Sequence, residues 1–260
     1  MIDHCVSFVF TVLVWWLGTG VILKLCTLPR RTFRWSMLGA SVMLAAAFYG
    51  LSHAARMTDT GGVYLSFISA IGVWGWIEMS FLMGFVTGPR ITPCPNDAAG
   101  WRRFGLALAT LLYHELMIVA AAAAIITLTW GLPNQTGTMA FLILAVMRAS
   151  AKLNIFLGVP NLTDSLLPER LGYLKSYFRR RSFNLLFPLS IAGGVLGAAR
   201  LAGQVFDSVG AEAVGAALLL TLLTLAMLEH FFMMMPIPDG ALWFWAMPAS
   251  AAKPIQRPAP

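Results

Sequence analysis

The sequence predicts an all-α protein, a polytopic membrane bundle of about seven transmembrane helices. Of its 260 residues, 58% are hydrophobic and only 11% are charged, and the mean hydropathy of +0.76 is far above that of a soluble domain. Seven apolar stretches are long enough to cross a hydrocarbon layer of ~30 Å as helices. Only short connections separate them, so we expect 1–260 to form a single transmembrane domain.

The spans are predicted near 6–26, 36–55, 62–86, 104–130, 136–158, 183–203 and 211–235. The first is expected to be a retained anchor, because it has no basic N-terminal segment and no small-residue cleavage site. The fifth is the most polar, since it carries Arg148, Lys152 and Asn154. The sixth contains Gly193 and Gly197, a spacing that permits close helix approach.

The connection between the fifth and sixth spans predicts an interfacial helix near 165–181. One helical face collects the apolar side chains Leu166, Leu167, Leu171, Leu174 and Phe178, and basic residues gather toward the end. This pattern is typical of a helix that faces anionic headgroups at the cytoplasmic interface. A connection that packs on its own bundle would show the same pattern, so both interpretations stay open. The proline-rich tail, 248–260, is expected to be loose.

The distribution of Lys and Arg predicts the orientation of the bundle. Thirteen basic residues lie on one side, in three connections and the tail: Arg30, Arg31, Arg34, Arg90, Arg102, Arg103, Arg170, Lys175, Arg179, Arg180, Arg181, Lys253 and Arg257. The other side carries Arg56, with Arg200 near the outer end of the sixth span. The positive-inside bias therefore predicts the N-terminus outside and the C-terminus in the cytoplasm. The net charge of +7 is no argument for binding nucleic acid.

Seven ionisable side chains lie inside the predicted spans, where such groups are rare. They are Glu78 in the third span, His114 and Glu115 in the fourth, Arg148 and Lys152 in the fifth, and Glu229 and His230 in the seventh. At 1.5 Å per residue, they lie about 9–15 Å from the cytoplasmic ends of their spans. We therefore expect them to share one layer in the cytoplasmic half of the bilayer.

Charged groups in this layer need compensation, because an isolated one costs roughly 2.5–3.5 kcal/mol on insertion scales. Arg148 and Lys152 are four residues apart and share a helix face, so carboxylates from other helices are expected to oppose them. The first interpretation is a buried charge network that includes Arg148, Lys152 and Asn154 and fixes the helix register. Such a network needs no ligand.

The second interpretation is a cofactor site. Imidazole nitrogens and carboxylate oxygens suit iron, zinc or manganese, so a metal site would use Glu78, His114, Glu115, Glu229 and His230. Alternatively, His114 or His230 alone could ligate the metal of a tetrapyrrole. Di-iron bundles place Glu and His three residues apart. Here the Glu and His of each pair are neighbours, about 100° apart around the helix, which disfavours one shared metal.

From Trp76 onward the chain carries a series of motifs that resemble a known family. They are Trp76-Ile-Glu-Met-Ser-Phe-Leu-Met-Gly-Phe, Gly88-Pro-Arg, Cys94-Pro, Tyr113-His-Glu, Met147-Arg-Ala-Ser-Ala-Lys-Leu-Asn-Ile-Phe-Leu-Gly-Val-Pro-Asn, Leu167-Pro-Glu-Arg-Leu, Tyr173-Leu-Lys-Ser-Tyr-Phe, Asn184-Leu-Leu-Phe-Pro, Glu229-His and Pro236-Ile-Pro-Asp-Gly-Ala-Leu-Trp-Phe-Trp-Ala. Together they resemble the photosynthetic complex assembly proteins of the PuhE type from phototrophic bacteria. The resemblance covers about 70–246, and the segment that begins at Met147 is its most specific part.

This resemblance implies a membrane factor for assembly of photosynthetic reaction-centre or light-harvesting complexes, or for bacteriochlorophyll supply to them. It implies reaction-centre or light-harvesting subunits as partners, besides the lipid bilayer, and a place in the bacterial inner membrane. His114 or His230 would then transiently ligate bacteriochlorophyll magnesium, and 165–181 would dock a partner. It implies no catalytic residues. The rival is a membrane metalloenzyme of tetrapyrrole metabolism that uses the His and Glu site. A transporter ranks last, since no inverted repeat is visible.

Overall fold

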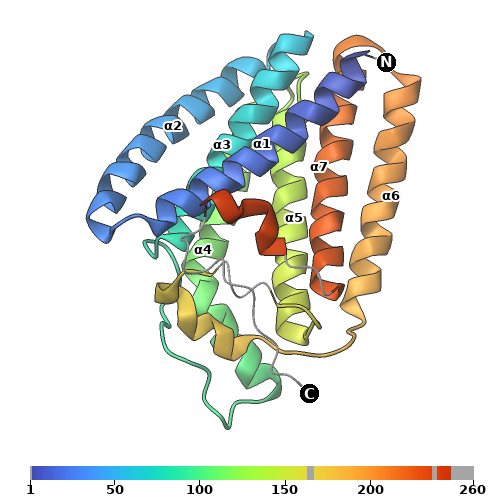
Figure 1. Cartoon of the computed structure of the whole chain (residues 1–260). Coiled ribbons are helices and arrows are strands. Elements are labelled where there is room, and N and C mark those ends of the chain that lie inside the picture. The colour runs from blue at the N-terminus through green and yellow to red at the C-terminus, as the bar shows by residue number, and fades with distance from the viewer. Residues whose placement is uncertain (1, 163–166, 236–238, 247–260) are drawn as a thin grey trace.

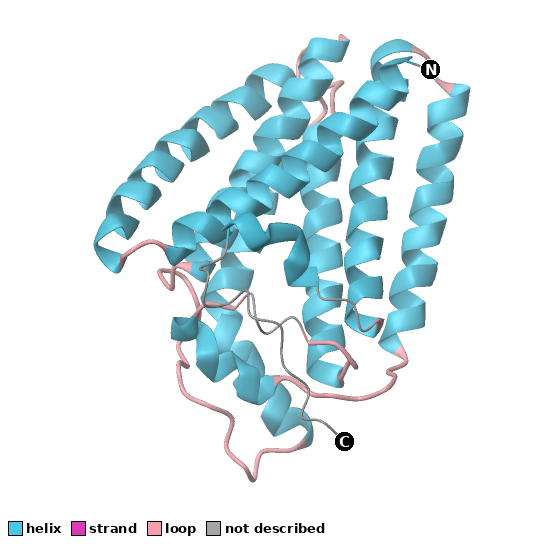
Figure 2. Cartoon of the chain, in the orientation of Figure 1, coloured by secondary structure: helices cyan, strands magenta, loops and turns pink. Residues whose placement is uncertain are grey.

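The computed structural model describes residues 2–162, 167–235 and 239–246. These residues contain seven helices that are long and apolar enough to cross a membrane, which confirms the predicted fold class. They are α1 (Ile2–Thr27), α2 (Phe33–Ala54), α3 (Thr60–Leu82), α4 (Gly100–Thr129), α5 (Thr136–Leu157), α6 (Leu186–Asp207) and α7 (Gly210–Met234). Among the described residues no strand forms, and the only bridge joins the backbones of Val159 and Arg180 (Figure 2).

The helices form one bundle in which α3, α5 and α7 contact one another (Figure 1). α2 packs on α3 at one edge, and α6 packs on α7 at the opposite edge. α1 runs obliquely across the bundle and contacts both α3 and α7. α3 and α7 are the most buried of the seven and α6 the least. An all-helical bundle is the expected solution, because helices satisfy their backbone hydrogen bonds within each span.

The core of the bundle combines large apolar side chains with close contacts at small residues. Phe67 of α3, Phe141 of α5 and Leu218 of α7 are fully buried in one cluster. At Gly137, α5 comes so close to α3 that its backbone N–H donates to the Ser66 hydroxyl at 2.9 Å. Such contacts hold membrane helices together, because lipid removes the hydrophobic drive for association between them.

Several span ends differ from prediction by three or four residues, and two of these differences have a reason visible in the backbone. α3 ends at Leu82 rather than near 86, because Gly84 takes a left-handed conformation with φ +79°. The Phe85 N–H then donates to the Ser80 carbonyl at 2.9 Å, closing the helix C-terminus. α6 begins at Leu186 rather than 183, because the Asn184 side chain accepts hydrogen bonds from the next two helical N–H groups.

The connection after α3 folds back against the backbone of α4. The Thr87 carbonyl accepts a hydrogen bond from the His114 N–H at 3.0 Å, and the Arg90 N–H donates to the Ala109 carbonyl at 3.2 Å. Gly88 lies between these two bonds, where an added Cβ would sit 2.2 Å from the Ala109 oxygen. The contact therefore depends on the absence of a side chain at Gly88.

The predicted interfacial segment contains a 3-10 helix, η3 (Glu169–Tyr177), that packs on the bundle itself. Leu171, Leu174 and Tyr177 are buried, and the two leucines share a cluster with Phe81 of α3. The described part of the apolar face therefore packs on the bundle, as in the second of the two interpretations. Leu166, which was assigned to the same face, lies outside the described residues.

The three arginine-rich connections all lie at the same end of the bundle (Figure 1). Another 3-10 helix, η4 (Asp239–Ala246), lies against α1, and the Trp243 indole donates to the Trp16 carbonyl at 3.0 Å. The predicted loose tail, 248–260, lies outside the described residues. Which end faces the cytoplasm stays a prediction from the charge distribution.

Candidate functional site

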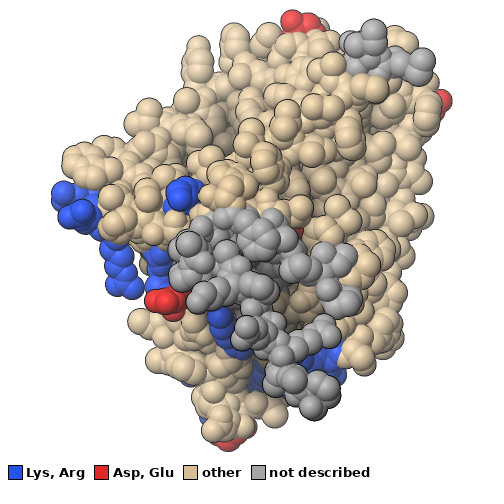
Figure 3. Space-filling view, viewed as in Figure 1, with Lys and Arg blue, Asp and Glu red and all other residues tan. Residues whose placement is uncertain are grey.

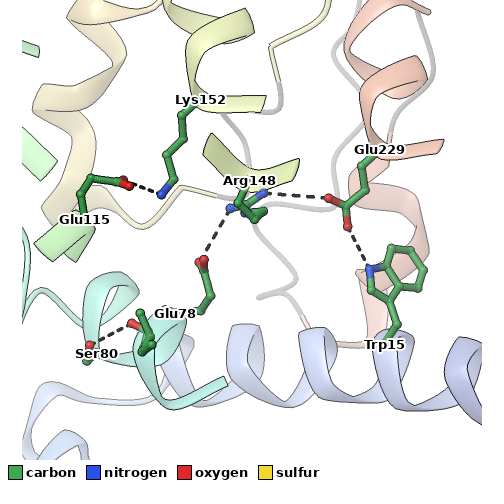
Figure 4. A network of polar contacts seen from close by, with 8 residues as sticks. Trp15, Glu78, Ser80, Glu115, Arg148, Lys152 and Glu229 are labelled. Atoms are coloured by element: carbon green, nitrogen blue, oxygen red, sulfur yellow. Dashed lines mark hydrogen bonds and ion pairs between the residues drawn. The ribbon is translucent and has the colours of Figure 1, made fainter. Parts of the chain in front are cut away.

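The polar layer is built around two cations on one face of α5. Arg148 and Lys152 are one helical turn apart, so they project in similar directions. Three carboxylates approach them from neighbouring helices: Glu78 from α3, Glu115 from α4 and Glu229 from α7 (Figure 4). The structure thus brings these five predicted residues together across four helices.

Arg148 joins α3 to α7 through two ion pairs. Its guanidinium nitrogens lie 3.7 Å from a Glu78 oxygen and 4.0 Å from a Glu229 oxygen. Both distances exceed hydrogen-bond length, so charge attraction rather than hydrogen bonding connects the groups. The Arg148 side chain remains 41% exposed, whereas that of Glu78 is 12% exposed.

Glu229 also connects α7 to α1. The Trp15 indole N–H donates to its second oxygen at 2.9 Å (Figure 4). Sequence reasoning missed this partner, because the two residues are 214 positions apart. A neutral N–H donor lowers the cost of a carboxylate in this layer without cancelling its charge.

Lys152 joins α5 to α4 through a short, direct pair. Its ammonium donates to the Glu115 carboxylate at 2.6 Å, and the two side chains are 22% and 28% exposed. With neutral imidazoles, the three carboxylates and two cations of the layer leave one negative charge. One oxygen of Glu78 is buried and has no hydrogen-bond partner among the described residues.

His114 occupies an unusual position on α4. It is 1% exposed, and its ring lies against Phe81, with 4.5 Å between ring centroids. Neither ring nitrogen has a hydrogen-bond partner in the described structure. A buried imidazole without partners costs free energy, so its presence calls for a physical explanation.

His230 is equally buried, but both of its ring nitrogens are engaged. Nδ1 lies 2.9 Å from the Ala226 carbonyl and Nε2 lies 2.9 Å from the Ser150 hydroxyl. The Ser150 hydroxyl in turn lies 2.7 Å from that of Ser190, so the group connects α5, α6 and α7. Asn154 belongs here, since its amide donates to the Ser190 hydroxyl at 3.3 Å. In the described structure it forms no hydrogen bond with Arg148 or Lys152, with which the sequence predicts a shared network.

The five residues of the predicted metal site do not form a ligand set. In the part of the chain that the structure describes, no three His, Cys, Asp or Glu side chains form a group that could hold a metal ion. Glu78 and Glu229 are directed at Arg148, and Glu115 at Lys152. The carboxylates therefore compensate cations instead of converging with the imidazoles.

Seven helices long and apolar enough to span a membrane, four of them joined by a layer of ion pairs, define a multi-pass integral membrane protein. The chain belongs to the family described as "Protein of unknown function (DUF3623)", which matches residues 1–254. It is also similar to a Rhodobacter capsulatus protein described as "Uncharacterized 30.4 kDa protein in puhA 5'region". The two are 36% identical over 260 residues, covering 96% of this chain and 94% of the relative. No solved structure matches the chain.

Proposed function

We propose that this protein is a membrane factor for assembly of photosynthetic complexes, of the PuhE type, and that it handles bacteriochlorophyll at His114. Support for the general role comes from the Rhodobacter capsulatus relative, which is described by its place in the puhA 5′ region. The similarity extends over nearly the full length of both chains. Reaction-centre or light-harvesting subunits would be its partners in the bacterial inner membrane.

The observation that carries the pigment assignment is the unpartnered imidazole of His114. A neutral histidine nitrogen is a common axial ligand for a tetrapyrrole metal. Neither His114 nitrogen has a hydrogen-bond partner among the described residues, and Phe81 lies against the ring. These features fit an axial ligand for bacteriochlorophyll. The pigment would bring the magnesium, and a His114 nitrogen would be its axial donor.

Access to His114 would require a local opening of the bundle. The ring is 1% exposed, and the segment from Thr87 to Arg90 lies against α4 on both sides of Gly88. This segment belongs to a connection and not to a span, so it can move without breaking a transmembrane helix. A transient ligand, as an assembly factor needs, is compatible with a site that closes after release.

The other predicted sites fit a cofactor less well. His230 would have to give up the contacts to Ala226 and Ser150 before it could ligate pigment. A metalloenzyme that uses the His and Glu residues lacks a convergent donor set among the described residues. We therefore assign pigment handling to His114 and a structural role to His230.

The general role is tested by tagging the full-length protein in a phototrophic host and purifying it in mild detergent. The expected result is copurification of reaction-centre or light-harvesting subunits, together with reduced complex levels in a deletion strain. An Arg56→Gln variant, altered at the end of the bundle away from the arginine-rich connections, serves as a control and should behave as wild type. Normal amounts of both complexes in the deletion strain would contradict the proposal.

A further inference from the structure

A cleft of about 710 Å³ lies at the end of the bundle that carries the arginine-rich connections. Three segments form it: the short helix η1 (Arg30–Thr32) with the start of α2, the connection after α3, and η3. Four arginines line it, namely Arg30, Arg31, Arg34 and Arg170. Figure 3 shows Lys and Arg side chains gathered in the left and lower parts of that view.

Arg170 is fixed in the wall of this cleft by contacts that leave its charge uncompensated. Its guanidinium donates to the backbone carbonyls of Cys26 at 2.8 Å and Met83 at 3.3 Å. It also lies over the Phe33 ring, 4.4 Å from the centroid. These partners are neutral, so they hold the side chain in place without supplying a counter-ion.

The other three arginines are also without a described acidic partner. No Asp or Glu is among the residues that line the cleft, and none of the ion pairs of the described residues involves Arg30, Arg31 or Arg34. Arg34 lies over the ring of Trp35, at 5.2 Å from its centroid. Four cations around one hollow, with no acidic partner among the described residues, repel one another and attract an anion.

The same cleft has an apolar part. Phe33, Phe85 and Leu171 line it beside the arginines, and the Phe85 side chain is 57% exposed. Aromatic and basic side chains together are typical of the membrane interface, where one end of a ligand is apolar and the other is charged. A ligand with both properties would fill the cleft better than a small inorganic anion.

We propose that this cleft binds the phosphate headgroup of an anionic phospholipid, with the acyl region against the exposed Phe85 side chain. The arginines would contact the phosphate oxygens, for which guanidinium groups are well suited. Bound lipid would join the connection after α1, the connection after α3 and η3 at one point. This inference is independent of the proposed role of His114.

The experiment uses the full-length protein, delipidated in detergent, and native mass spectrometry. Short-chain phosphatidylglycerol is titrated against phosphatidylcholine of the same chain length. We expect tighter binding of phosphatidylglycerol, weakened about fivefold per arginine removed near the membrane surface. The first variant is Arg30→Gln with Arg31→Gln, because both residues are exposed and neither side chain forms a hydrogen bond or ion pair with the part of the chain that the structure describes. Arg170→Gln is the second variant, with folding checked by thermal unfolding.

The matched control is Arg56→Gln with Arg102→Gln, which removes two charges outside the cleft and should leave the preference unchanged. Equal binding of the two lipids by the wild type would overturn the proposal. So would an equal loss in the control variant. A thermal-shift arm with inorganic phosphate separates the two sources of the anion. Stabilisation by phosphate that is lost in Arg30→Gln with Arg31→Gln, together with equal binding of the two lipids, would assign the cleft to a soluble anion and overturn the lipid assignment.

Discussion

The Lys152 ammonium lies 2.6 Å from the Glu115 carboxylate and directly joins α5 to α4. Replacing Lys152 by Met would leave Glu115 unpaired in the spanning region, and we expect a loss of about 3 kcal/mol in the free energy of unfolding. The double variant Lys152→Met with Glu115→Gln should recover most of that loss, because no charge remains uncompensated. Thermal or denaturant unfolding in detergent measures the free energy of unfolding of the wild type and of both variants.

The exposed pair of Arg102 and Asp97 provides the control for this cycle. Its atoms also lie 2.6 Å apart, but the side chains are 60% and 69% exposed. Arg102→Gln should therefore leave stability unchanged. If Lys152→Met were equally silent, the pair in the bundle would contribute nothing and the network account would be wrong.

The carboxylates around Arg148 are predicted to differ in importance. Glu78 is the more buried, and its nearest approach to Arg148 is 3.7 Å against 4.0 Å for Glu229. Glu78→Gln should therefore destabilise more than Glu229→Gln, whose amide oxygen could still accept from Trp15. Arg148→Met should destabilise more than either glutamate variant, with a loss of about 3 kcal/mol or more in the free energy of unfolding, because it leaves two carboxylates unpaired. The reverse order of the two glutamates in unfolding experiments would contradict this geometry.

The two buried histidines should respond in opposite ways to replacement by Phe. His230→Phe removes contacts with Ala226 and Ser150, so we expect a loss of about 1–3 kcal/mol. His114→Phe removes a ring without hydrogen-bond partners and should leave the stability of pigment-free protein unchanged or slightly raised. Parallel unfolding measurements test this contrast. A large loss in His114→Phe would mean that His114 has a structural role.

Gly88 should not tolerate a side chain. Because an added Cβ would lie 2.2 Å from the Ala109 oxygen, Gly88→Ala should push the segment after α3 away from α4 and destabilise by about 1–3 kcal/mol. Gly105→Ala on α4 is the matched control, since nothing lies within 4 Å of its added Cβ. Hydrogen exchange at the His114 amide, which donates to Thr87, reports on the contact directly. Unchanged protection in Gly88→Ala would contradict this packing.

Ionisation of Tyr173 should lower the stability of the protein at high pH. Burial raises the pKa of its hydroxyl in η3, outside the spanning helices. The stabilising contribution is fully present below the unfolded pKa of about 10 and is lost as pH rises through the folded value. Tyr173→Phe should therefore flatten the decline in stability above that pH. An identical pH profile in wild type and variant would show that another group is responsible.

Much of the fold could be predicted because membrane spans have a fixed length and composition. The ends could not, since they depend on single residues such as the left-handed Gly84 and the capping Asn184. The need for carboxylates opposite Arg148 and Lys152 also followed from the cost of charge in a bilayer. The pairing did not, because it depends on how each helix is rotated and which neighbour it meets.

The helical periodicity of α5 already indicates that Asn154 lies on a different face from Arg148. Six residues separate it from Arg148, which places it about 240° around the helix at 100° per residue. Ser150 is four residues before Asn154 and shares its face. The helical period therefore separates Asn154 from the charged face, and the Asn154 amide accordingly lies with Ser190. No comparable signal marks Trp15 as the partner of Glu229.

The most direct test of the central claim is the bacteriochlorophyll content of the protein purified from a phototrophic host. Wild type, His114→Phe and His230→Phe are compared at equal amounts of folded protein, by absorption of extracted pigment. We predict pigment in wild type and His230→Phe and its loss in His114→Phe. Pigment retained in His114→Phe, or absent from wild type, would contradict the assignment of His114 as the ligand.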